Sequence, residues 1–161
     1  MSPAPLFFQH LEVGMRKKKM KGPERIAKTV ETLRHWQKLE RQAIENMSDL
    51  MEKTDNLLIR QFLEIIRSDS TQHHRVQQFI IDSLTTTPVS LTPEDLAEVW
   101  DAIAAHDEVE RETIEIAKEL KEECTFFVQS ALLEYLIIDE EKHDHILGQL
   151  EKFKKNLYPY G

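Results

Sequence analysis

The sequence is poor in cysteine, glycine and proline, and it has no long apolar run. Cys124 is the only cysteine among 161 residues, which excludes an intrachain disulfide and points to a reducing compartment. Four glycines, six prolines and 31% charged residues favour long helices over β-sheet. No apolar stretch approaches the ~20 residues that a transmembrane helix needs, and no N-terminal segment resembles a signal peptide. We therefore expect a cytoplasmic protein that does not enter a membrane.

The charge balance is acidic, with a formal net charge of −8. This charge argues against general binding to nucleic acids or to anionic membranes. A local exception is the basic run Arg16-Lys17-Lys18-Lys19-Met20-Lys21. Such a run is more typical of a solvated arm than of a partner-binding patch. We expect a basic N-terminal arm over residues 1–22 and a nonhelical tail over residues 157–161.

Apolar residues recur at three- and four-residue steps through most of the remaining chain, which predicts four long helices. The expected ranges are 23–54, 56–84, 93–122 and 126–155. Thr92 and Pro93 have the pattern of an N-cap followed by proline in the first turn. Residues 85–92 are β-branched and contain proline, which predicts an extended connection. Four amphipathic helices of matched length predict one all-α, four-helix bundle over residues 23–156.

The two halves of the chain contain an internal repeat. Residues 39–80 and 109–150 align without a gap and are identical at ten of 42 positions. In this alignment Glu40 corresponds to Glu110 and His73 corresponds to His143, so the interval from glutamate to histidine is the same in both halves. In an antiparallel hairpin, positions equally far from the turn lie at the same level. Each of the two predicted hairpins can therefore present one glutamate and one histidine at a common level.

Glu140 and His143 form an E-x-x-H pattern, in which the two side chains share one face of a helix. Carboxylates and an imidazole on such a face can bind a divalent metal such as iron or manganese. Glu40 and Glu110 both lie within apolar stripes, where an acidic group needs a partner or a metal ion.

With this combination the chain resembles the ferritin-like and rubrerythrin-like dimetal proteins. That family takes one glutamate from each of two helices and E-x-x-H from each of the other two. The resemblance covers residues 23–156 and implies a ferritin-like bundle of two hairpins joined by a crossover connection. It implies Glu40 and Glu110 as the lone-helix ligands, His73 and His143 as the imidazole ligands, and Glu140 as a bridging carboxylate.

One position departs from the family pattern. Ser70 stands where the first hairpin should carry its bridging glutamate. His106 and Asp107, about one turn before Glu110, could substitute for the missing ligand. Asp139 lies four residues before His143 and could orient its imidazole, as acids next to metal-bound histidines commonly do.

The resemblance implies one or two iron or manganese ions used in redox chemistry of oxygen or peroxide, with an unknown small-molecule substrate or electron donor. Two alternatives stay open: a degenerate, noncatalytic bundle that acts in dimerisation or partner binding, and a hemerythrin-like oxygen binder. The sequence has no His-x-x-x-His, which argues against the oxygen binder. It also has no rubredoxin-type cysteine pairs. We expect a homodimer that binds neither nucleic acid nor membrane.

Overall fold

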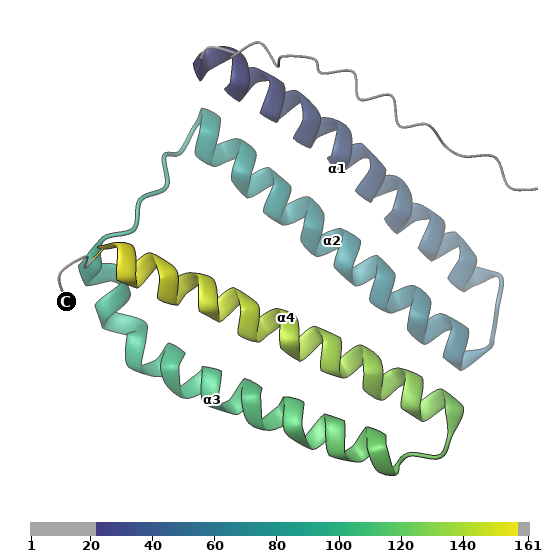
Figure 1. Cartoon of the computed structure of the whole chain (residues 1–161). Helices are drawn as coiled ribbons and strands as arrows, with labels where there is room; N and C mark the ends of the chain where they lie inside the picture. The colour runs from purple at the N-terminus through teal and green to yellow at the C-terminus, as the bar shows by residue number, and fades with distance from the viewer. Residues whose placement is uncertain (1–21, 158–161) are drawn as a thin grey trace, which may run out of the picture. The chain divides into compact units, whose positions relative to one another are not determined.

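The computed structural model describes residues 22–157, and every regular element in this range is an α-helix (Figure 1). The helix ends lie within two residues of those predicted from the sequence. The basic arm and the tail fall outside the described residues, except for Gly22 and Leu157 at their edges. None of the described helices combines the length and apolar character needed to cross a membrane. The helices are α1 (Gly22–Glu52), α2 (Leu57–Thr85), α3 (Pro93–Glu123) and α4 (Phe127–Leu157).

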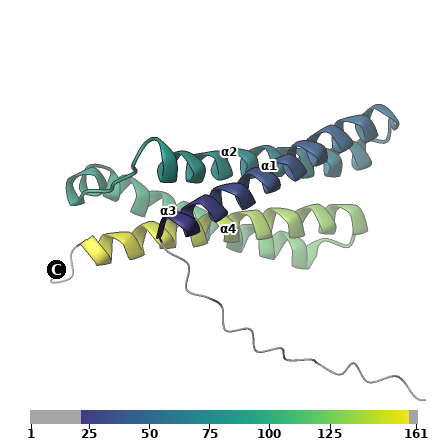
Figure 2. The same cartoon turned by 90° about the horizontal axis from the view of Figure 1, so that it is seen from above.

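The chain divides into two compact units after Val89. In the first, α1 packs against α2, and in the second, α3 packs against α4. We call these pairs the first hairpin and the second hairpin. Figures 1 and 2 show each pair running antiparallel and side by side. The four helices predicted from the sequence are thus confirmed as two hairpins, and the single bundle over residues 23–156 stays a prediction.

Local signals in the sequence account for where the helices begin. The Asn56 side chain caps α2 by accepting hydrogen bonds from the backbone N–H groups of Leu58 and Ile59. Thr92 and Asp95 form a reciprocal capping box at the start of α3, where Pro93 occupies the first turn. The predicted N-cap at Thr92 is therefore confirmed.

The two hairpins share one register. Each hairpin has two consecutive contacts between its helices, and the contacts of the first recur at the aligned positions of the second. The contacts are Glu40–His73 and Arg41–His74 in the first hairpin, and Glu110–His143 and Arg111–Asp144 in the second. The internal repeat in the sequence therefore corresponds to a repeat in structure.

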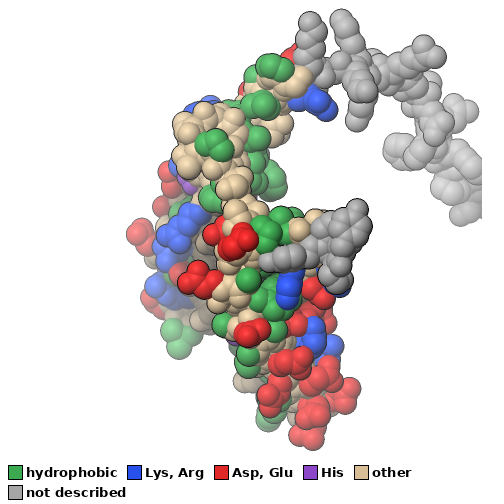
Figure 3. Space-filling model, turned by 90° about the vertical axis from the view of Figure 1, so that its left-hand side faces the viewer, with side chains coloured by type: hydrophobic (Ala, Val, Ile, Leu, Met, Phe, Trp, Pro, Cys, Tyr) green, Lys and Arg blue, Asp and Glu red, His purple; other side chains and the backbone are tan. Residues whose placement is uncertain are grey.

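Each hairpin buries only the seam between its two helices. The buried apolar residues are Leu33, Ile81, Leu96, Ile114, Ala117 and Ile137. Many other large apolar side chains are exposed, and Figure 3 shows hydrophobic groups reaching the surface among the charged ones. A two-helix hairpin cannot cover more than one stripe of each helix, so both hairpins present apolar surface outside their own seam.

The connection between the hairpins is one residue shorter than the predicted range 85–92. It comprises residues 86–92, because α2 continues to Thr85 and α3 begins at Pro93. The eight steps from Thr85 to Pro93 reach at most about 28 Å. A helix of 29 residues such as α2 is about 44 Å long. A crossover along the whole length of a bundle would therefore require the helix ends beside the connection to unwind.

Candidate metal centre

The second hairpin brings together three of the predicted ligands. Glu110 comes from the middle of α3 and is only 7% exposed. It lies on the buried face of α3, together with Ile114 and Ala117 one and two turns later. Glu140 and His143 come from α4, one turn apart, and are partly buried. The helical spacing of both segments thus turns their polar side chains toward the seam.

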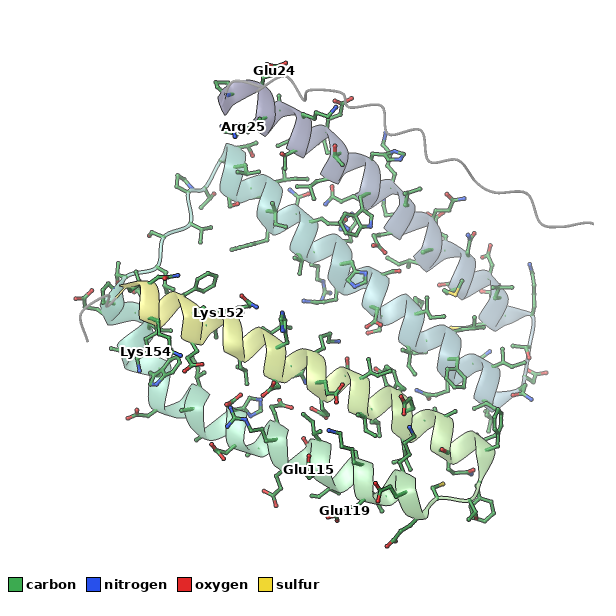
Figure 4. The ribbon with its side chains drawn as sticks, in the orientation of Figure 1. Glu24, Arg25, Glu115, Glu119, Lys152 and Lys154 are labelled. Carbon is green, nitrogen blue, oxygen red and sulfur yellow. The ribbon has the colours of Figure 1, made fainter. Side chains whose placement is uncertain are left out.

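The donor atoms of Glu110, Glu140 and His143 all lie within 4.8 Å of one another. The Nδ1 atom of His143 is 3.3 Å from Oε2 of Glu140 and 3.6 Å from Oε2 of Glu110. In Figure 4, side chains of α3 and α4 fill the space between these two helices. The sequence placed Glu110 and His143 at a common level, and the structure confirms that they meet.

The two carboxyl groups shift each other's pKa in opposite directions. Their mutual hydrogen bond is the largest influence on both: it raises the pKa of Glu140 and lowers the pKa of Glu110. Burial and the negative charge of Glu110 raise the pKa of Glu140 further, whereas His143 and His106 help to lower that of Glu110. The opposite directions of these two pKa shifts follow because two close like charges are unfavourable, so the first proton bound to the pair favours Glu140.

The other ring nitrogen of His143 faces an acid. Its Nε2 atom lies 3.9 Å from Oδ2 of Asp139, which also pairs with Lys142. Nδ1 is thus turned toward the two glutamates while Nε2 is turned toward an aspartate. A metal-binding histidine commonly has this arrangement, with the outer acid fixing the ring orientation. The geometry fits the orienting role predicted for Asp139.

His106 also contacts the centre. Its Nε2 atom lies 2.8 Å from Oε1 of Glu110, one helical turn away. The sequence suggested His106 and Asp107 equally as substitute ligands. In the structure His106 contacts Glu110, whereas Asp107 pairs with Arg111 on the same helix.

No protein-family model matches this chain, and no curated protein or solved structure matches it significantly. The donor types are those of a transition-metal site: imidazole suits iron and zinc, and carboxylate suits manganese. Glu110 also needs compensation for its burial, which a cation would supply. The residues of the second hairpin therefore fit a divalent metal ion.

The first hairpin brings together the other two predicted ligands. Glu40 is 8% exposed, and its Oε1 atom lies 3.3 Å from Nδ1 of His73. Ser70 is buried as well, at the position that corresponds to Glu140. Because serine places no carboxylate there, this hairpin offers one acid and one imidazole where the second offers two acids and one imidazole.

Two buried glutamines in the first hairpin were not predicted as part of any site. Gln37 donates hydrogen bonds from Nε2 to the carbonyl oxygen of His74 at 3.3 Å and to Oε1 of Gln78 at 3.0 Å. The side-chain nitrogen and oxygen of Gln77 are buried without a hydrogen-bond partner. The spacing gave a signal, since Gln77 lies one turn after His73 on the same face of α2.

Proposed function

We propose that this chain is a metal-binding protein of the ferritin-like type, in which Glu110, Glu140 and His143 hold iron or manganese. The observation that carries the proposal is the convergence of three donor atoms within 4.8 Å, from two helices and around a buried carboxylate. When bound, such an ion supplies redox chemistry toward oxygen or peroxide. The chain itself supplies the two carboxylates and the imidazole that fix its position.

The exposed apolar surfaces support packing of the two hairpins into one four-helix bundle. Such a bundle, with the crossover connection that the ferritin-like resemblance implies, remains part of this proposal.

Metal binding would change the protonation of the carboxyl groups in the centre. A carboxylate must be ionised to act as a ligand. Glu110 and Glu140 would hold the ion in their ionised forms, so any proton on Glu140 would leave on binding. His143 would offer Nδ1, which faces the two glutamates, while its Nε2 faces Asp139.

A noncatalytic bundle is the second candidate, and the first hairpin favours it. Glu40 and His73 satisfy each other at 3.3 Å, and the neighbouring position is the neutral Ser70. In such a protein the Glu–His pairs of both hairpins would hold the helices in register without a metal.

Metal content separates these two functions. The full-length protein should be produced with added iron and manganese and assayed by elemental analysis. We expect about one ion or more per chain in the unaltered protein and substoichiometric metal in Glu140→Ala. Glu141→Ala is the matched control, because Glu141 is exposed and pairs with Lys118 outside the centre. Equal, substoichiometric metal in all three proteins would overturn the proposal and favour the noncatalytic bundle.

A further inference from the structure

We propose that His106 is a fourth ligand, so that the second hairpin alone binds a single divalent transition-metal ion through two carboxylates and two imidazoles. This inference rests on the proposed function and goes beyond it. The family resemblance implies ions shared between both halves of the chain, and the sequence suggested His106 only as a substitute for the missing carboxylate. The geometry points instead to a centre that one hairpin completes.

The position of His106 relative to Glu110 is the first support. The two oxygens of Glu110 face different imidazoles: Oε1 lies 2.8 Å from Nε2 of His106, and Oε2 lies 3.6 Å from Nδ1 of His143. The His106 side chain is 61% exposed, so packing does not dictate its direction. It is turned inward by its contact with a buried carboxylate. His106 lies outside the group of donor atoms within 4.8 Å of one another, so its exposed imidazole would have to turn from Oε1 of Glu110 toward an ion held by Glu110, Glu140 and His143.

A hollow in the same hairpin is the second support. It has a volume of about 270 Å³ and is lined by His106, Glu110, His143, Ile146 and Leu147. Three of these five residues carry metal-binding donors, and the other two are aliphatic. The hollow gives an ion space beside its ligands, and it leaves room for water or a small substrate as an additional ligand.

Charge and donor count give the third support. Glu110 and Glu140, once ionised, carry two negative charges, which balance one divalent cation. Two imidazoles complete a four-donor set of the kind that zinc and iron accept. The set therefore needs neither a second ion nor a ligand from elsewhere to reach neutrality.

The repeat shows that the first hairpin has no equivalent set. When the two halves are aligned, His106 corresponds to Trp36 and Glu140 corresponds to Ser70. Both differences remove a donor, and only Glu40 and His73 remain. Two of four ligands are thus missing from one half of the chain, and we expect one ion per chain rather than two.

Metal titration of the full-length protein tests this inference. After EDTA treatment, the protein would be titrated with Fe²⁺ without oxygen, and separately with Mn²⁺ and Zn²⁺. Native mass spectrometry would give the number of ions and calorimetry the affinity. We expect one ion per chain for the metal that binds most tightly, and affinity lowered at least about ten-fold in His106→Ala and His106→Gln. Glutamine is included because its amide can keep a hydrogen bond to Glu110 without supplying an imidazole.

His145→Ala is the matched control, since His145 is another exposed histidine of the second hairpin and contacts Gln149 instead of the centre. Its affinity should equal that of the unaltered protein. With Co²⁺ as a spectroscopic probe, both His106 variants should shift the visible absorption bands, and His145→Ala should not. Such a shift reports a changed ligand, which a purely structural role of His106 would not produce.

Two outcomes would overturn the inference. One is two ions per chain in the unaltered protein, bound with similar affinity. The other is unchanged affinity and unchanged Co²⁺ bands in both His106 variants. If Glu140→Ala still abolishes binding in either case, the proposed function stands while the role of His106 fails. If the unaltered protein binds none of the four metals, both fail together.

Discussion

Glu110 and Glu140 bring carboxylate oxygens within 4.8 Å of each other across the seam of the second hairpin. The two residues come from different helices, and their interaction raises the pKa of Glu140 and lowers that of Glu110. Two imidazoles flank the same pair, His106 on the α3 side and His143 on the α4 side. This arrangement gives the buried Glu110 carboxylate polar partners when no metal is bound. It also holds donor atoms close enough together to bind a metal ion.

The raised pKa of Glu140 predicts a pH dependence of stability in the metal-free protein. Because the pKa of Glu140 is raised above its ordinary value of 4.5, its stabilising contribution is complete below that value and is lost as pH rises through the raised pKa. Glu140→Gln keeps a hydrogen-bond donor and cannot ionise. Relative to this variant, the unaltered protein should lose stability as pH rises from about 4.5 toward neutrality. Urea unfolding in EDTA across this range measures the difference.

Glu110 gives the opposite pH dependence of stability at acidic pH. Its pKa is lowered, so its contribution is present above the ordinary value and is lost as pH falls through the lowered pKa. The pair is therefore most stabilising between the two shifted values. Parallel stability curves for the unaltered protein and Glu140→Gln would contradict the raised pKa of Glu140.

Asp139 should affect metal affinity without being a ligand. Its carboxylate faces Nε2 of His143 at 3.9 Å, and Asp139→Asn would weaken the orientation of that ring. We expect metal affinity to fall by about 10- to 100-fold with unchanged stoichiometry, measured by calorimetry. Lys142→Gln is the control, because it removes the other partner of Asp139 and leaves the His143 contact in place. A comparable loss in both variants would assign the effect to the ion pair instead.

Gln77 should be replaceable with a gain in stability. Its buried amide has no hydrogen-bond partner, and the corresponding residue of the second hairpin is Leu147. Gln77→Leu should raise the free energy of unfolding by about 1–3 kcal/mol, since burying an unpaired amide is unfavourable. Gln37→Leu is the matched control and should lower it, because Gln37 is equally buried but hydrogen-bonded to His74 and Gln78. Urea denaturation of both variants gives the comparison.

Ser70→Glu should restore the missing carboxylate of the first hairpin. Together with Glu40 and His73 it would form a three-ligand set like that of Glu110, Glu140 and His143. We expect one additional, weaker metal ion per chain by native mass spectrometry. Without metal, the buried carboxyl group should lower the free energy of unfolding by about 1–3 kcal/mol. Ser70→Ala removes the hydroxyl without adding an acid and should leave the stoichiometry unchanged.

Much of this arrangement follows from periodicity. The start of α3 was predictable because its signal is local, with Thr92 as N-cap followed by Pro93. The meeting of Glu110 with His143 was predictable because an antiparallel hairpin converts equal sequence distances into equal levels.

What could not be predicted depends on side-chain rotamers and on tertiary burial. Spacing alone places both His106 and Asp107 near Glu110, and only the structure shows that Arg111 takes the aspartate. The unpaired burial of Gln77 likewise depends on what faces it across the seam. The predicted connection was one residue too long because the β-branched Thr85 belongs to the last turn of α2.

The common register of the hairpins has one more consequence. Every side chain around the centre in one half has a counterpart in a closely similar helical setting in the other. Trp36 occupies the position that corresponds to His106, and Ser70 the position that corresponds to Glu140, on the same backbone framework. The first hairpin thus corresponds to the second with two donor residues replaced. Any probe that distinguishes the halves compares the two versions within a single sample.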